Sequence, residues 1–148
     1  VVEEGPPVEI FERPGPTVLS RVTSVENVFE GTVTDTDRAA GVMTCTMPGF
    51  ALEIPLADVH PGTKVRVGVR ANDIIIATSA PQGLSARNLL PATIVSISER
   101  GFQREVLAEC GNQAFRVTLT PRAIETLALT EGSTVWLVIK GTSCFVIE

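Results

Sequence analysis

The sequence predicts a mostly β protein made of two related small barrels. Many short stretches are rich in β-branched residues or alternate apolar and polar residues, Pro and Gly turns separate them, and a single convincing helix interrupts them. Two segments also recur in the same order: Asn-apolar-apolar at Asn27 and Asn88, and residues 61–73 at 131–143. Short strands, close turns and an internal repeat are typical of small barrels of the oligonucleotide/oligosaccharide-binding class.

The first part of the chain is expected to begin with two short helices and continue as strands. Residues 7–12 have Pro7 in their first turn and Pro14 beyond their end, and residues 17–22 form the second expected helix. Alternation and β-branched residues then predict strands at 30–35, 42–46, 50–54, 64–69 and 74–77.

The second part is expected to be β with one helix. Residues 79–83 form a turn or linker, and strands are predicted at 92–97, 104–109, 114–119, 134–139 and 145–147. Thr120 is placed as the cap of a helix with Pro121 at its first position, and the helix ends before Gly132. The repeat offsets are 61 and 70 residues, so a nine-residue insertion in the second copy accounts for this helix.

The repeat divides the chain into a linker at 1–23, a first β unit at 24–80 and a second at 84–148. Each unit has only about 60 residues, which is marginal for independent folding. Packing together or exchanging strands would bury their apolar faces. The alternative is that unrelated β sequences merely look alike.

Composition excludes several classes of protein. The 148 residues are 44% hydrophobic and 20% charged, and no apolar run approaches the roughly 20 residues of a membrane helix. A net charge of −5 and 5% aromatics oppose nucleic-acid binding. The whole net charge falls in residues 1–83, so the second part is the better place for an anion.

The cysteines and the histidine carry no predicted chemistry. Cys45, Cys110 and Cys144 are odd in number and lie in or beside predicted strands, which favours buried reduced thiols over disulfides. His60 is a lone histidine in a turn, so a solvated loop position is expected and no metal site is predicted. No nucleophile or phosphate-loop motif is present, so no catalytic residues are predicted and the chain is not expected to be an enzyme.

The two repeats differ in charge at matching positions. The second copy has Ser85-Ala86-Arg87-Asn88 and Lys140-Gly141-Thr142-Ser143, where the first has Glu26 in place of Arg87 and Asp73 in place of Ser143. Cations, hydroxyls and small residues without a carboxylate suit an anion, and the helix start at Thr120 would help. The alternative is that these are ordinary surface charges, a turn and a helix cap.

These motifs resemble a known family. Ser85-Ala86-Arg87-Asn88-Leu89-Leu90 and Ile139-Lys140-Gly141-Thr142-Ser143 resemble the Mop/TOBE molybdate-binding domain. Gly-Pro-Pro-Val-Glu at 5–9 and Glu-Asn-Val-Phe-Glu-Gly at 26–31 resemble the C-terminal region of the ATP-binding subunit of molybdate/tungstate ABC importers. The resemblance implies tandem barrels that follow an ATPase core and, because the chain starts with Val1, a fragment of a longer protein.

The resemblance also implies a ligand and a set of binding residues. Molybdate or tungstate oxyanion is the expected ligand, with no other cofactor, and its implied contacts are Ser85, Ala86, Arg87, Asn88, Thr120, Lys140, Gly141 and Thr142. Two departures from the family remove possible donors. Gly141 stands where the family often has Ser or Ala, and Ala123 stands where a hydroxyl is usual.

The implied role is regulation of import by a cytoplasmic domain at the inner face of the membrane. Its implied partners are a second copy, through the parent ATPase, and the membrane permease subunits. The alternative is a TOBE interaction or dimerisation module that binds no ligand and belongs to an importer of another solute. A nucleic-acid-binding barrel is supported by fold analogy alone.

Overall fold

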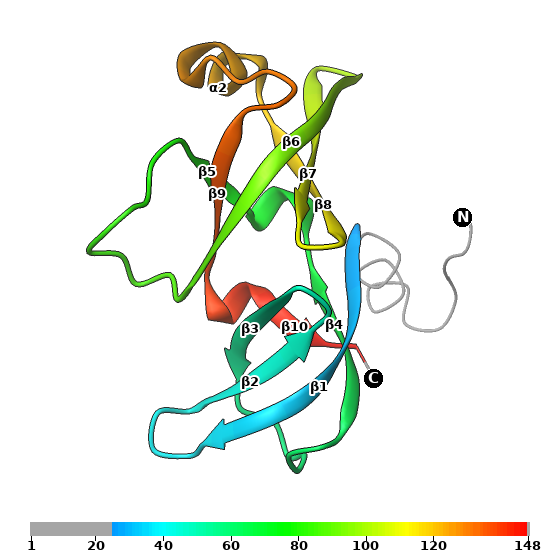
Figure 1. The fold of residues 1–148 in the computed structure, drawn as a ribbon, viewed down its shortest axis with the longest axis vertical. Helices are drawn as coiled ribbons and strands as arrows, with labels where there is room; N and C mark the ends of the chain where they lie inside the picture. Colours follow the sequence, from blue (N-terminus) through cyan, green and yellow to red (C-terminus); the bar gives the residue numbers. More distant parts are fainter. Residues whose placement is uncertain (1–24, 148) are drawn as a thin grey trace.

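The computed structural model describes residues 25–147, so both N-terminal helix predictions lie outside the described residues. The first half of the chain contributes five strands and a short 3-10 helix (Figure 1). They are β1 (Asn27–Asp37), β2 (Val42–Met47), β3 (Phe50–Pro55), β4 (Lys64–Val69), η1 (Ala71–Asp73) and β5 (Ile75–Ala77).

The second half repeats this order with one α-helix added. Its elements are β6 (Asn88–Arg100), β7 (Gln103–Cys110), β8 (Gln113–Leu119), α2 (Pro121–Leu127), β9 (Thr134–Ile139), η2 (Gly141–Ser143) and β10 (Cys144–Val146). The mostly β prediction is confirmed. The α-helix lies between β8 and β9, where the repeat offsets predict an insertion.

The two five-stranded sheets exchange their last strands. Their orders are β10-β4-β1-β2-β3 and β5-β9-β6-β7-β8, so they correspond strand by strand. The short β5 of the first half pairs with β9, and β10 of the second half pairs with β4. Each sheet therefore needs both halves of the chain, and the division into units at 24–80 and 84–148 stays a prediction.

The backbone repeats in detail. The ladder of β1 shifts register between Val33 and Asp35, and that of β6 shifts between Ile94 and Ser96, at the same place in the repeat. Strands β1 and β6 are longer than the sequence predicts, because they begin at Asn27 and Asn88, before the β-branched pattern begins. The bounds of β4 and β9 are as predicted, and β5 is one residue shorter.

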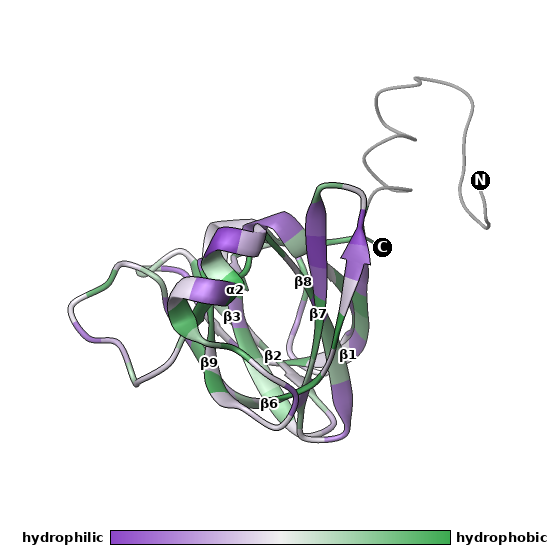
Figure 2. Ribbon diagram, turned by 90° about the horizontal axis from the view of Figure 1, so that it is seen from above, coloured by the Kyte–Doolittle hydropathy of each residue, from purple (hydrophilic) through white to green (hydrophobic). Residues whose placement is uncertain are grey.

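Apolar residues of both sheets form one core. Side chains alternate between buried and exposed along most strands, which is visible as alternating hydrophobic and hydrophilic colour along the ribbons (Figure 2). The rings of Phe29 and Phe115, from different sheets, have centroids 4.6 Å apart, and Phe50 lies 5.2–5.3 Å from both. This aromatic contact joins the two barrels.

Two hairpin turns meet at a close backbone approach between the barrels. Gly49 in the β2–β3 turn and Gly111 in the β7–β8 turn both have positive φ. A Cβ added to Gly111 would lie 2.8 Å from the Gly49 Cα. Only glycine meets both requirements, the left-handed backbone and the missing side chain.

The structure places the three cysteines and the histidine where the sequence predicts. The three cysteines are free thiols and buried, and His60 is exposed beside the turn at Pro61. Within residues 25–147, no helix is long and apolar enough to cross a membrane.

Candidate anion-binding site

A pocket of about 410 Å³ brings together five of the eight predicted site residues. Ser85 and Arg87 come from the segment before β6, and the others belong to the strand end and turn at η2. The opposite wall comes from the first half of the chain, at the β1–β2 turn and β3. The predicted residues in the lining are Ser85, Arg87, Lys140, Gly141 and Thr142.

The segment before β6 carries Ser85 and Arg87 to this pocket. Residues 78–87 leave the body of the molecule as an extended loop between β5 and β6 (Figures 1 and 2). Ser85 and the Arg87 side chain are exposed, so both groups are open to solvent at the pocket rim.

Asn88 is a structural clamp. Its side chain is 4% exposed and binds β3 across the barrel boundary. The amide nitrogen donates to the Glu53 carbonyl at 2.9 Å, and the amide oxygen accepts from the Glu53 backbone N–H at 2.8 Å. This two-way bonding uses the amide on the protein itself, so the structure does not place Asn88 in the pocket lining.

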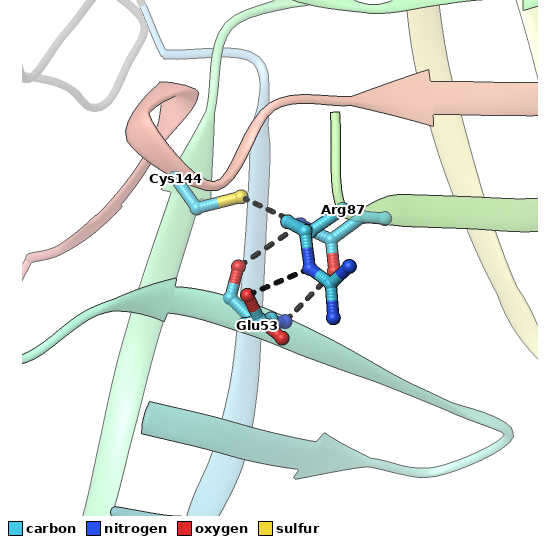
Figure 3. A network of polar contacts seen from close by, with 4 residues as sticks. Glu53, Arg87 and Cys144 are labelled. Carbon is cyan, nitrogen blue, oxygen red and sulfur yellow. Dashed lines mark hydrogen bonds and ion pairs between the residues drawn. The ribbon is translucent and has the colours of Figure 1, made fainter. Parts of the chain in front are cut away.

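Glu53 lines the pocket and is the residue that the sequence prediction missed. Its carboxylate Oε2 accepts a hydrogen bond from the Arg87 Nε at 3.2 Å (Figure 3). The Glu53 side chain is 26% exposed and the Arg87 side chain 69%. The pair is 34 residues apart in sequence. The strand registers place Glu53 of β3 where Arg116 stands in β8. The matched sequence segments, at offsets of 61 and 70, do not include this strand, so the sequence carried no signal for Glu53.

Lys140 supplies the second cation. It precedes η2, its carbonyl accepts from the Ser143 N–H at 2.9 Å, and its side chain is exposed. No ion pair to Lys140 is present among residues 25–147, which leaves its ammonium group available to a ligand.

Gly141 has a packing reason to lack a side chain. A Cβ there would lie 3.2 Å from the Glu53 carbonyl oxygen, because η2 packs against β3. The small residue thus keeps η2 close to β3.

Thr120 and Ala86 do not line the pocket. The Thr120 hydroxyl oxygen accepts from the Ala123 N–H at 3.2 Å and caps α2, as the sequence predicts. Figure 1 places α2 at one end of the molecule, away from η2 and β3. Within one chain, therefore, the structure does not bring Thr120 together with Arg87 and Lys140.

The matching place in the first repeat is occupied by the protein itself. Glu26, aligned with Arg87, accepts a hydrogen bond from the Ala71 N–H at 2.9 Å through its carboxylate. Arg70, aligned with Lys140, lies over the Phe145 ring at 5.3 Å from its centroid. Asn27 clamps β8 as Asn88 clamps β3, with its amide bonded to the Arg116 N–H at 2.7 Å and carbonyl at 2.9 Å.

A larger hollow, of about 730 Å³, lies between β1, β2 and β4. Lys64 and Arg66 line it with the carboxylate-bearing Glu30, and none of the predicted site residues does. Each hollow has two cations, two hydroxyl side chains and one carboxylate, so their composition does not separate them. The smaller pocket is the candidate because it alone of the two is lined by residues of the predicted site.

Comparisons with known proteins define the class. Residues 84–146 match the TOBE domain. The chain is also similar to the cytoplasmic molybdate-binding protein ModG, whose structure holds molybdate. That similarity has a TM-score of 0.73 at 26% identity and covers 83% of this chain and 96% of ModG.

The relatives narrow the class further. The chain is 35% identical over 138 residues to the molybdenum import ATP-binding protein ModC of Rhizobium etli, covering 92% of this chain and 38% of that protein. It is 29% identical over 143 residues to the molybdate/tungstate import ATP-binding protein WtpC of Pyrococcus abyssi, covering 97% and 38%. The chain thus resembles the accessory region of importer ATP-binding subunits and spans about two fifths of their length.

Proposed function

We propose that the chain binds a tetrahedral oxyanion, molybdate or tungstate, in the pocket formed by Arg87, Lys140 and the β3 wall. The observation that carries the proposal is the convergence of two cations and the Ser85 and Thr142 hydroxyls on one space. Charge-assisted hydrogen bonds from such groups hold oxyanions strongly. The molybdate named for ModG and the ATP-binding relatives supports the choice of ligand.

The proposed role is regulation of import by a non-catalytic region of an ATP-binding subunit. A ligand shifts an equilibrium by its difference in affinity for two states. Oxyanion that favours one arrangement of a dimer would bias the attached ATPases toward it. The partners in this proposal are a second copy and membrane permease subunits, and the domain acts in the cytoplasm at the membrane.

A second candidate is an interaction module without a ligand. Two observations favour it: Arg87 is already paired with Glu53, and Thr120 lies outside the pocket. On this hypothesis the clamped barrels serve only as a rigid contact surface.

Thermal unfolding of the chain with molybdate, tungstate and sulfate at matched ionic strength separates the two. A ligand at 100 times its dissociation constant stabilises the native state by about 2.7 kcal/mol, or roughly 5–10 °C for a protein of this size. We expect this shift with molybdate or tungstate and its loss in the Arg87→Ala, Lys140→Ala double variant. The absence of any shift in the natural chain would favour the interaction module.

A further inference from the structure

Glu53 places a carboxylate inside a pocket that is otherwise suited to an anion. We propose that Glu53 is a tethered counter-ion that competes with the oxyanion for Arg87 and so sets the affinity of the site. This inference rests on the proposed function. It assigns to Glu53 a role in tuning affinity, separate from any contact that holds the ligand.

The fold fixes Glu53 in this position. Both of its backbone polar groups are bonded to the Asn88 side chain, at 2.8 and 2.9 Å. Asn88 directly follows Arg87, so the same clamp that joins the barrels brings the Glu53 carboxylate to the Arg87 guanidinium. The ion pair is therefore a consequence of barrel packing, because the clamp fixes the backbone of residue 53 beside Arg87.

The arginine is the partner that can move. Its side chain is 69% exposed against 26% for that of Glu53, and the contact runs through Nε at 3.2 Å. An exposed pair of this kind contributes little to stability, so reorienting the guanidinium toward a ligand requires little free energy.

The charges of the pocket lining determine how the Glu53–Arg87 pair affects oxyanion binding. The pocket lining holds two cations and one carboxylate, a net charge of +1. A dianion that carries no proton has no hydrogen bond to donate to Glu53 and is repelled by it. An oxyanion that retains a proton, such as hydrogen phosphate, can donate to the carboxylate instead. Glu53 therefore weakens the binding of fully ionised oxyanions most.

The test is equilibrium binding of molybdate, by calorimetry near pH 8, to the natural chain and to Glu53→Gln. Glutamine keeps the size of the side chain and removes its charge, and the clamp to Asn88 uses only the backbone of residue 53. We expect molybdate to bind the variant about tenfold more tightly, and hydrogen phosphate to gain less.

Glu105→Gln is the matched control. Glu105 is a carboxylate with a 20% exposed side chain that pairs with Arg100 and Arg116 and does not line the pocket. Its substitution removes the same charge from a similar environment, so we expect no change in molybdate affinity. A gain of similar size in both variants would show a general charge effect and overturn the role of Glu53.

The outcomes separate this inference from the proposed function. Binding to the natural chain with unchanged or weaker binding to Glu53→Gln overturns the competitor role alone. Binding only to Glu53→Gln supports the role and overturns oxyanion binding by the natural chain. If neither protein binds molybdate, both proposals are overturned.

Discussion

The two copies of the repeat share a backbone fold and differ in what lies at the matching turns, η1 in the first copy and η2 in the second. In the first copy the Glu26 carboxylate accepts the hydrogen bond of the Ala71 N–H, so an anionic group of the protein occupies the turn. In the second copy Arg87 stands in place of Glu26, and a pocket lies beside Gly141. The charge at one position, Glu26 or Arg87, thus distinguishes the two turns. The first is hydrogen-bonded by a carboxylate of the protein, and the second lies beside an open pocket.

The clamps are the feature that the copies have in common. Asn27 and Asn88 are 2% and 4% exposed, and each bonds both backbone groups of one residue in the opposite barrel. The proposal that only the second copy binds oxyanion therefore rests on the charged residues around two equivalent clamps. The role of each copy can be tested separately.

The largest expected effect is loss of a clamp. Asn27→Ala and Asn88→Ala each remove two hydrogen bonds and leave part-buried backbone groups without partners, which costs about 2–4 kcal/mol. We expect similar losses of unfolding free energy in the two variants, measured by urea denaturation. Only Asn88→Ala should also weaken molybdate binding, and equal binding by both variants would contradict the asymmetry.

The next effect concerns the turn-to-turn contact between the copies. Gly111→Ala combines a φ of +62° with a Cβ 2.8 Å from the Gly49 Cα, and we expect a loss of about 2–3 kcal/mol. Gly101 has the same φ of +62° and open space around it. Gly101→Ala should therefore lose only about 1 kcal/mol in the same denaturation experiment, and equal losses would remove the close approach as a cause.

Alkaline pH should reveal a third difference between the copies. Burial, together with the nearby Cys45, raises the pKa of the Cys144 thiol from 9.0 to about 12. The unfolded chain loses this proton above pH 9 while the native chain keeps it. Stability contributed by the neutral thiol is thus present below pH 9 and falls by about 1.4 kcal/mol per pH unit between 9 and 12.

Cys144→Ala tests this dependence. It should lessen the fall in unfolding free energy between pH 9 and 10.5, measured by urea denaturation at each pH. Part of the fall should remain, because burial also raises the pKa of the Cys45 and Cys110 thiols. The repeat aligns Cys144 with Ile74, which has no ionisable group, so Ile74→Ala is the matched truncation and should keep the full slope. An unchanged slope in Cys144→Ala would show that other groups dominate.

The smallest effect on stability separates Glu26 from Arg87. Glu26→Ala removes the carboxylate acceptor of the buried Ala71 residue's N–H, and we expect a loss of about 1 kcal/mol in thermal or urea unfolding. Arg87→Ala breaks an exposed ion pair and should cost 0.5 kcal/mol or less while removing molybdate binding. Loss of molybdate binding in Glu26→Ala and its retention in Arg87→Ala would place the ligand site in the first copy.

The sequence could predict the strands because their apolar residues repeat with the sheet period, and the helix because Thr120 and Pro121 mark its start. It could not predict which sheet takes β5 and β10. Each has only three residues, and the same ladder positions exist in both sheets. The packing of the whole chain determines which sheet each of these two strands joins.

The candidate site was predictable where charge differs between the repeats, at Arg87 in place of Glu26 and Ser143 in place of Asp73. Lys140 is matched by the cation Arg70 in the first copy. Asn88 looks like a ligand residue in sequence because it adjoins Arg87, yet its amide is used by the fold. Glu53 was missed because it reaches the pocket through pairing across barrels, which leaves no local motif.

The central claim is that the second copy, not the first, holds the oxyanion. Calorimetric titration of molybdate into Lys140→Ala and into Arg70→Ala tests it most directly, because the two cations occupy the same position of the repeat. We expect saturable binding to be lost or weakened at least tenfold in Lys140→Ala and unchanged in Arg70→Ala. Retained affinity in Lys140→Ala, or a loss confined to Arg70→Ala, would contradict the account.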